Sequence, residues 1–370
     1  MSDSRLIGQP VDAVDTPALI VDADVLTRNL LSLQRASEAA GLQVRPHIKA
    51  HKTPQIAQMQ VRAGAVGVTA AKIGEAEVMA DAGIEDIFIA NILIGEAKLR
   101  RLVALARRVP KLSVAVDSLA GAEPLGAAFA AAGMSLDVMI EVDTGAGRCG
   151  VLPEQVAPFA REVAGVAGLR LVGIMAYAAG SYACRNEDER RACAAREGAT
   201  LAALGDELRR DGHDIRRLSG GSTPTAGRYV AGNGLTEIRS GTYCLNDHNQ
   251  VDLGTCTVAD VAATVLATVI SHPAPNRYIT DAGTKALDQQ VSQLTEGYGV
   301  LLDPPGARVV KINDEHGYLD RAAGDLHIGD KVRIIPPRIC TCLNLYDEMI
   351  IVQEGIVRDV WRIAARGKNT

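Results

Sequence analysis

The basic side chains between Arg45 and Lys52 are the residues near the N-terminus best suited to chemistry, in the order Arg-Pro-His-Ile-Lys-Ala-His-Lys. They overlap the end of the first predicted strand, 44–49, so we expect Lys49 at the inner end of a buried strand. A buried bare ammonium is costly, so such a lysine needs a partner or a covalent role. One such role is a Schiff base with a carbonyl cofactor. The alternative is a basic surface loop that binds phosphate or nothing.

A second candidate is the segment Gly145-Ala146-Gly147-Arg148-Cys149-Gly150, which matches the G-x-G-x-x-G pattern of dinucleotide-binding loops. Two features argue against a dinucleotide. The segment follows the fifth apolar run rather than the first, and the next run ends at Tyr177 without an acidic residue for a ribose hydroxyl. The other interpretation is a tight loop that brings Arg148 to a binding site.

Two further segments combine glycine with small hydroxyl residues. They are 219–223, which contains Ser222 and Thr223, and 240–243, which contains Gly241, Thr242 and Tyr243. Small residues let backbone N–H groups close around a phosphate, and such a site recurs after the last two strands of (β/α)8 barrels. The alternative is that these are ordinary loop glycines.

The elements that must position these residues alternate in a regular way. Short apolar runs are separated by Ala- and Leu-rich stretches with helical spacing, and glycines stand where the helices should end. Eight strands, each followed by a helix, favour a closed (β/α)8 TIM-like barrel over an open doubly wound sheet. The predicted strands are 44–49, 65–71, 87–92, 112–117, 136–143, 169–177, 215–219 and 237–243.

After Asp247 the pattern changes to Val- and Ile-rich segments separated by turn residues, which predicts a mostly β C-terminal domain. We expect the early strand 18–21 to pair with that domain. The predicted domains are therefore a barrel at 24–247 and a β domain at 1–23 plus 248–370. The predicted strands of the β domain are 257–269, 277–281, 309–313, 331–335, 349–352 and 357–363.

Bulk composition narrows the class of partner and compartment. A net charge of −5 without a basic stripe argues against nucleic acid and anionic membranes as partners. No apolar run approaches the length that spans a bilayer, and the N-terminus lacks the pattern of a secretory signal. Seven scattered cysteines are better explained as reduced thiols than as a disulfide framework. We therefore expect a cytoplasmic protein.

Taken together, these motifs resemble those of fold-type III pyridoxal phosphate (PLP) enzymes, whose N-terminal domain is like that of alanine racemase. The resemblance is strongest to the branch of D-threonine aldolase and D-serine dehydratase, and it extends over nearly the whole chain. The segments that carry it are 15–18, 45–52, 141–150, 219–225, 237–247, 281–285, 314–317 and 365–368.

The resemblance implies PLP as cofactor and assigns roles to individual residues. Lys49 matches the Schiff-base lysine, Arg148 the arginine that faces the phenolic oxygen of PLP, and Tyr177 the tyrosine that lines its ring. The phosphate-binding residues would be Ser222, Thr223, Gly241, Thr242 and Tyr243. PLP would then act as an electron sink, and the protein would select the Cα bond that breaks by orienting it.

The chain departs from this branch where a divalent metal (manganese, zinc or magnesium) is expected. The family holds it with a His-x-Asp or His-x-Cys pair, but here the segment reads Arg338-Ile339-Cys340. Cys340 matches the second metal ligand, whereas Arg338 stands in place of the histidine and has no lone pair to donate. Arg338 could instead bind a substrate carboxylate or polarise a hydroxyl.

The resemblance implies a PLP-dependent lyase for D-3-hydroxy amino acids. It would act by retro-aldol cleavage, as in D-threonine aldolase, or by elimination, as in dehydratases of D-serine or 3-hydroxyaspartate. Lys49 would remove the α-proton in elimination, and His316 is a candidate for handling the β-hydroxyl proton. The alternatives are a metal-independent amino-acid racemase or epimerase and a non-catalytic PLP-binding protein. The family also implies a homodimer.

Overall fold

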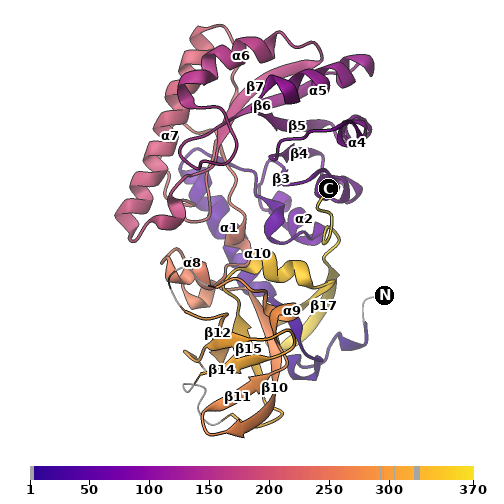
Figure 1. The fold of residues 1–370 in the computed structure, drawn as a ribbon, viewed down its shortest axis with the longest axis vertical. Helices are drawn as coiled ribbons and strands as arrows, with labels where there is room; N and C mark the ends of the chain where they lie inside the picture. The colour runs from indigo at the N-terminus through magenta and orange to yellow at the C-terminus, as the bar shows by residue number, and fades with distance from the viewer. Residues whose placement is uncertain (1–3, 292–293, 295, 304, 321–325) are drawn as a thin grey trace. The chain divides into compact units, whose positions relative to one another are not determined.

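The computed structural model describes residues 4–291, 294, 296–303, 305–320 and 326–370 (Figure 1). The chain divides into two compact units, which we call the barrel unit and the β unit. The barrel unit comprises Leu31–Lys49, Pro54–Gly241 and Lys368–Thr370. The β unit comprises Met1–Leu30, Ala50–Thr53 and Thr242–Gly367.

The sheet of the barrel unit consists of eight parallel strands in the order β2-β9-β8-β7-β6-β5-β4-β3. Its two ends meet, because Thr69 N donates to Pro46 O over 2.8 Å and His47 forms a parallel bridge with Thr69. Each of the eight predicted runs overlaps one strand, although β2 shares only Val44 with its run, and the predicted TIM-like barrel is confirmed. The strands are β2 Gln43–Val44, β3 Val68–Ala70, β4 Asp86–Ile89, β5 Lys111–Val116, β6 Leu136–Val142, β7 Leu169–Ala176, β8 Arg217–Gly220 and β9 Glu237–Ile238.

Helices lie on the outside of these strands, and Figure 1 shows α4 to α7 around β4 to β7. Gly41, Gly83, Gly133, Gly168 and Gly212 stand between a helix and the next strand, and all have positive φ. Glycine adopts this left-handed conformation without a steric cost, which is why it ends helices. The helices are α1 Ala23–Ala39, α2 Pro54–Arg62, α3 Ile73–Asp81, α4 Glu96–Ala106, α5 Leu119–Ala131, α6 Val156–Ala164 and α7 Glu187–Arg210.

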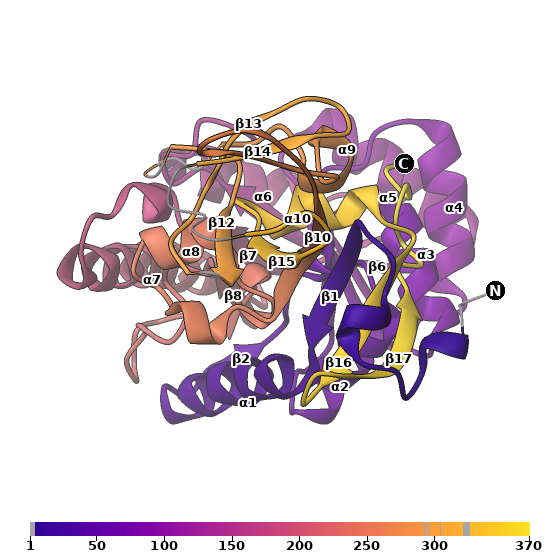
Figure 2. The same cartoon turned by 90° about the horizontal axis from the view of Figure 1, so that it is seen from below.

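The β unit is built on a mostly antiparallel sheet with the main strand order β13-β14-β11-β10-β1-β16-β17, and β15 joins β12 to β10. β1 pairs with β10 and, in parallel, with β16 (Figure 2), so the predicted pairing of segment 18–21 with this domain is confirmed. The strands are β1 Ala18–Asp22, β10 Ala263–Ala274, β11 Arg277–Thr280, β12 Val300–Asp303, β13 Val309–Ile312, β14 Gly317–Leu319, β15 Lys331–Ile335, β16 Glu348–Gln353 and β17 Ile356–Arg362.

Two details of the β unit differ from the prediction. The strand expected from residue 257 begins at Ala263, because Thr257 and Asp260 form a capping box around a 3₁₀ turn. β12 and β14, of four and three residues, were not predicted. Short helices complete the two units: α8 His248–Asp252, α9 Thr284–Leu287, α10 Ile339–Cys342, η1 Ser4–Leu6, η2 Val11–Ala13, η3 Ile48–Ala50, η4 Pro153–Gln155, η5 Ser181–Ala183, η6 Thr242–Cys244, η7 Val258–Asp260 and η9 Leu343–Leu345.

The packing of both units supports the predicted class of fold, a TIM-like barrel with a mostly β C-terminal domain. Phe88, Met139 and Met175 belong to a buried cluster contributed by strands of the barrel. A separate cluster in the β unit includes Val265 and Ile334. Among the described helices, none combines the length and apolar character needed to cross a membrane.

Candidate functional site

The candidate residues of the barrel unit follow the carboxyl ends of its strands. Because all eight strands are parallel, these ends meet at one end of the barrel, where such folds build their active sites. Lys49 follows β2, Arg148 follows β6, Tyr177 follows β7, Thr223 follows β8 and Gly241 follows β9.

Lys49 is the middle residue of the 3₁₀ turn η3. Its side chain is exposed, whereas its neighbours Ile48 and Ala50 are fully buried. The expectation that Lys49 is buried is therefore wrong, and the desolvation argument does not apply to it. The physical reason is that β2 ends at Val44, so Lys49 belongs to a turn beyond the strand. An exposed amine on a turn held by buried neighbours is accessible to a carbonyl compound.

The glycine-rich loop after β6 is closed around the carboxylate of Asp143. Its Oδ1 accepts hydrogen bonds from the backbone N–H groups of Gly145, Ala146 and Gly147 at 2.9, 2.7 and 3.1 Å. In a dinucleotide-binding loop such N–H groups face the pyrophosphate. Here a side chain of the same loop already occupies them. The geometry therefore favours the second interpretation, a tight loop that presents Arg148.

Arg148 and Tyr177 are brought together in the structure. The guanidinium carbon of Arg148 lies 5.3 Å from the centre of the Tyr177 ring, within the range of a cation–π contact. Arg148 Nη2 also lies 3.7 Å from Oε1 of Glu141. Thr144 Oγ1 donates to the carbonyl of Tyr177 over 3.2 Å, which ties the two loops together. A cation and an aromatic ring thus stand side by side at the carboxyl end of the barrel.

Ser222 and Thr223, in the loop after β8, are buried. Ser222 Oγ donates to Ser181 Oγ, and Ser240 Oγ donates to Ser222 O over 2.8 Å. His47 N donates in turn to Ser240 O over 3.1 Å. These bonds link the loops that follow β2, β7, β8 and β9. The loop that carries Lys49 is therefore tied through Ser240 to the loop proposed to bind phosphate.

In the β unit, Thr242 and Tyr243 begin the 3₁₀ turn η6 and are buried. Thr242 Oγ1 lies 3.6 Å from the Sγ atom of Cys340, so the structure brings these two candidates together. Arg338 is the exposed N-cap residue of α10, and Cys340 is half-buried.

Asp247 holds the segment that contains Arg338 and Cys340. Its Oδ2 accepts from Ile339 N over 3.1 Å, and its Oδ1 accepts from Gln250 N over 3.0 Å. Burial raises the pKa of the Asp247 carboxyl to about 7, although these N–H groups and the charge of Arg338 oppose the shift. The start of α8 and the start of α10 are therefore joined through one buried carboxyl group.

His316 is exposed in the turn between β13 and β14, where its carbonyl accepts from Asn313 N over 2.9 Å. The same turn accepts hydrogen bonds from the start of α9, through Thr284 N to Asn313 O and Lys285 N to Asp314 O. His316 thus lies at the sheet edge beside α9, whereas Cys340 belongs to α10.

Among the residues that the structure describes, no group of three or more His, Cys, Asp or Glu side chains could hold a metal ion. The protein side of a typical zinc site supplies three or four such donors. Arg338 stands beside Cys340 as a permanent cation without a lone pair. The donors of this chain near Cys340 therefore do not form a metal site of that type.

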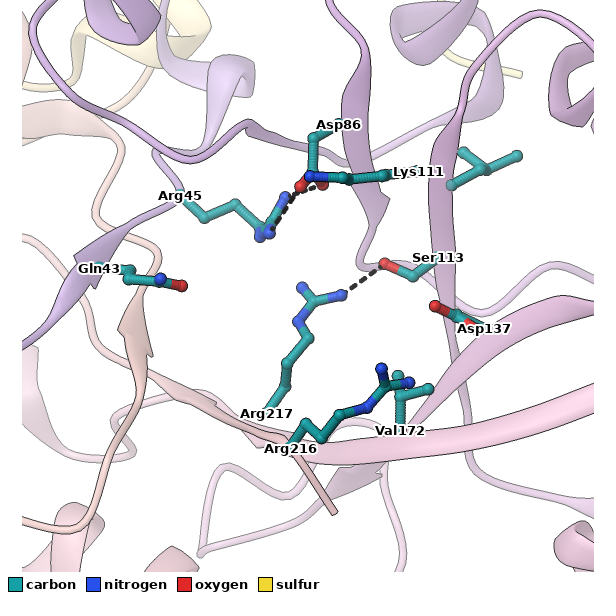
Figure 3. A pocket seen from close by; sticks show the side chains of 10 residues that line it. Gln43, Arg45, Asp86, Lys111, Ser113, Asp137, Val172, Arg216 and Arg217 are labelled. Carbon is teal, nitrogen blue, oxygen red and sulfur yellow. Dashed lines mark hydrogen bonds and ion pairs between the residues drawn. The ribbon is translucent and has the colours of Figure 1, made fainter. Parts of the chain in front are cut away.

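An open cavity of about 310 Å³ lies at the opposite, amino end of the barrel (Figure 3). It is lined by residues at the starts of strands, and Figure 3 shows Arg45 paired with Asp86 and Arg217 bonded to Ser113. The predicted site residues are not among those that line it. We call this charged amino end of the barrel, with the residues that line the cavity, the floor of the barrel.

Sequence reasoning did not single out Glu141, Arg239 or Asp247, although all three are buried and ionisable. A signal for the first two was present, because each is a charged residue inside an apolar strand run. Burial of a charge requires compensation, so such residues mark polar networks inside a barrel.

Comparison with known proteins relates both units to enzymes. Residues 21–248 match the family model of the alanine racemase N-terminal domain, and residues 262–352 match a putative serine dehydratase domain. The chain is 34% identical over 365 residues to a D-threonine aldolase of an Arthrobacter species, covering 97% of this chain and 95% of that protein.

Two further relatives extend the comparison to a dehydratase and to a solved structure. A D-threo-3-hydroxyaspartate dehydratase of Delftia sp. (strain HT23) is 34% identical over 348 residues, covering 88% of this chain and 91% of the relative. The crystal structure of D-threonine aldolase from Filomicrobium marinum superposes with a TM-score of 0.88 at 34% identity, covering 98% of each chain. The similarity thus includes the barrel and the β unit together.

Proposed function

The chain belongs to the alanine racemase-like family of PLP enzymes, and from this we propose that it is a PLP-dependent lyase for D-3-hydroxy amino acids. The observation that carries the proposal is the similarity to a D-threonine aldolase over 97% of the chain. A second relative of equal identity is a D-threo-3-hydroxyaspartate dehydratase. An aldolase breaks the Cα–Cβ bond of a 3-hydroxy amino acid, and a dehydratase breaks the bond between Cβ and its hydroxyl oxygen. A racemase is not needed to explain these findings.

The residues at the carboxyl end of the barrel fit the chemical groups of PLP. Lys49 offers an exposed amine to the aldehyde, and Tyr177 offers a ring face. Arg148 offers a permanent cation to the phenolic oxygen. The bound cofactor supplies an electron sink for the charge left at Cα when one of its bonds breaks.

The proposed phosphate-binding residues are small or hydroxylic. Ser222 and Thr223 follow β8, Gly241 follows β9, and Thr242 and Tyr243 come directly after Gly241 in the chain. Gly221 has φ +92°, and a Cβ atom there would lie 3.1 Å from Ile238 Cβ, so glycine permits the loop to pass close to β9. Backbone N–H groups of such a loop bind phosphate without a charged side chain.

Two side chains are proposed to move protons. Lys49 would remove the proton from Cα in an elimination, acting as a base within reach of that atom. His316 is proposed to help with the proton of the β-hydroxyl group. A histidine suits this role, because its ordinary pKa lies near neutrality.

We further propose that Arg338 acts on the substrate directly. A guanidinium binds a carboxylate through two parallel hydrogen bonds, or it polarises a hydroxyl group as a fixed charge. Cys340 remains the candidate ligand if manganese, zinc or magnesium binds. Chelation separates the two roles: activity that survives a chelator supports Arg338, and activity restored by one of these metals supports Cys340.

The proposed reaction is tested by product analysis with D-threonine, D-serine and D-3-hydroxyaspartate. Glycine with an aldehyde identifies an aldolase, and an oxo acid with ammonia identifies a dehydratase. Exchange of the Cα proton for deuterium with inversion, and no cleavage product, would instead identify a racemase. Tight PLP binding without turnover of any amino acid would identify a non-catalytic PLP-binding protein.

The role of Lys49 is tested separately by reduction of the holoenzyme with borohydride and peptide mapping. We expect the pyridoxyl group on Lys49, and none in Lys49→Ala. Lys111→Ala is the matched control, since Lys111 is exposed at the other end of the barrel, where β5 starts. A pyridoxyl group on another lysine would contradict the assignment.

We also propose a cytoplasmic homodimer, as the family resemblance implies. The seven cysteines are free in the structure, which is compatible with a reducing compartment. Light scattering of the purified holoenzyme at several concentrations tests the dimer.

A further inference from the structure

We propose that Glu141 is a positioning residue, which holds the guanidinium of Arg148 against the ring of Tyr177. This inference rests on the proposed function, because it assigns a role to Glu141 through the contact that Arg148 would make with the cofactor. Three observations support the inference: the hydrogen bonds of the loop that contains Arg148, the burial of Glu141, and the buried cation of Arg239 near Glu141. All of these residues lie within the barrel unit.

The backbone around Arg148 is fixed at both ends. Val151 N donates to Glu141 O over 2.8 Å, and Asp143 N donates to Val151 O over 2.9 Å, so the two ends of the loop are paired. Gly150 N donates to Oδ2 of Asp117 over 3.2 Å. Together with the three N–H groups on Asp143, these bonds fix the Cα atom of Arg148. The direction of its long side chain is left to other contacts.

Glu141 is the contact that can set this direction. The side chain of Arg148 is 58% exposed, so most of its rotamers are open to it, whereas the side chain of Glu141 is only 6% exposed. A buried carboxylate on β6 is held by the strand and cannot follow a moving partner. The 3.7 Å ion pair therefore restricts Arg148 rather than Glu141. Of the positions open to Arg148, this pair favours the one above Tyr177.

A buried cation near Glu141 favours the charged form of its carboxyl group. Arg239 is buried and donates to Ser219 Oγ and to the carbonyl of Ala176, each over 2.6 Å. Burial raises the pKa of the Glu141 carboxyl, and the charges of Arg148 and Arg239 oppose this shift. Asp117 faces Glu141 as a like charge, and the pKa of the Cys149 thiol is raised by burial and by both carboxylates.

These contacts form a continuous connection between Glu141 and the ring of Tyr177. Arg239 bonds to the carbonyl of Ala176, the residue directly before Tyr177, and Arg148 lies over the ring itself. Glu141 thus lies between a buried arginine and an exposed one. A carboxylate in this place orders the exposed arginine before the cofactor binds, and preorganisation of this kind raises affinity.

The test is a double-mutant cycle with PLP affinity as the readout, measured by titrating the apoenzyme with PLP and following absorbance. We expect Arg148→Gln to weaken PLP binding at least tenfold and Glu141→Gln to weaken it about fivefold. Because Glu141 acts through Arg148, adding Glu141→Gln to the Arg148→Gln variant should cause no further loss. Glu154→Gln, an exposed substitution near the same loop, is the matched control and should bind like the wild type.

A spectroscopic signature separates positioning from a general loss of stability. The pH midpoint of the absorbance band of bound PLP should move in the same direction in Glu141→Gln as in Arg148→Gln, by a smaller amount. Glu141→Asp keeps the charge but shortens the side chain, so it should lie between the wild type and Glu141→Gln. This variant also provides the test if Glu141→Gln does not fold.

The outcomes distinguish this inference from the proposed function. Wild-type PLP affinity in Arg148→Gln would refute the proposed placement of Arg148 at the cofactor. Weakened binding in Arg148→Gln with unchanged binding in Glu141→Gln would refute the positioning role alone. Additive losses in the double variant would also refute it, because they would show that Glu141 acts independently of Arg148.

Discussion

Replacing Glu237 by glutamine removes the carboxylate that Arg45 and Arg217 share in the floor of the barrel. Glu237 Oε2 accepts from Arg45 Nε over 3.0 Å, and its Oε1 accepts from Arg217 Nη2 over 2.9 Å. Burial opposes the charge of Glu237, but these two arginines hold the pKa of its carboxyl well below the ordinary range. The side chain is 1% exposed, so a glutamine amide there would face two guanidinium groups without a charge to offer.

The expected loss of stability in Glu237→Gln depends on which arginine is left without a negatively charged partner. Arg45 keeps its ion pair with Asp86, whereas Arg217 keeps the neutral hydroxyl of Ser113 at 2.8 Å and its contact with the Phe88 ring, and neither carries a negative charge. Removing one partner of a buried pair costs roughly 3–5 kcal/mol. Because the side chain of Arg217 is 20% exposed and partly hydrated, we expect the lower end, about 3 kcal/mol, for Glu237→Gln.

The assay is urea unfolding followed by circular dichroism. With a slope of about 3 kcal/mol/M, the midpoint should fall by about 1 M at pH 7. Because the folded pKa of Glu237 is depressed, its stabilisation is present above the unfolded pKa of about 4.3 and is lost as pH falls through the lower folded value. The difference between the variant and the wild type should therefore shrink in acid. Glu207→Gln, exposed on α7, is the control and should leave the midpoint unchanged.

The reasoning would be refuted by a Glu237→Gln midpoint equal to that of the control. A second check uses the pair Arg217→Gln and Glu237→Gln together. Removing the stranded guanidinium should recover part of the loss, since the cost arises from an unpaired buried charge and not from the missing carboxylate itself. A double variant that is less stable than the sum of the two single variants would contradict this origin.

Two further predictions concern pH and packing. Since the folded pKa of Asp247 is raised to about 7, the folded protein binds more protons than the unfolded chain between about pH 4 and 7, and stability should decline as pH rises through that range. Asp247→Asn should remove this decline, and parallel pH profiles of the urea midpoint would contradict the prediction. A Cβ atom at Gly173 would lie 2.1 Å from the carbonyl oxygen of Arg217 in β8, so Gly173→Ala should cost about 2 kcal/mol in urea unfolding. At Gly121, in α5, the nearest atom is the tip of Ile94 at 3.1 Å, so Gly121→Ala should be tolerated, and equal losses in both variants would argue against the close strand contact.

The strands and helix ends of the barrel could be predicted because their signals are local. Strands buried on both faces are continuous apolar runs, and a helix that ends in the left-handed conformation selects glycine, as at Gly83 and Gly133. β14 was missed because a segment of three residues carries too short a pattern, whereas β12 was missed although it is as long as the predicted β11 and β13. The exposure of Lys49 was missed for a related reason, since an apolar run does not tell where the strand within it ends.

Some features of the candidate site could likewise be predicted from the sequence, and others could not. The types of its residues and their order after successive strands were legible in the sequence, because parallel strands bring their carboxyl ends to one edge. The sequence did not predict three contacts of the site. They are the ion pair of Glu141 with Arg148, the hydrogen bonds from the glycine-rich loop to Asp143, and the hydrogen bond from Ile339 N to Asp247. These depend on the directions of side chains and on distances between segments that lie far apart in the chain, or on a loop conformation that spacing alone leaves open. Residue types and periodicity thus determined the architecture and the chemistry available, whereas burial and charge pairing in the folded barrel decided which groups act on one another.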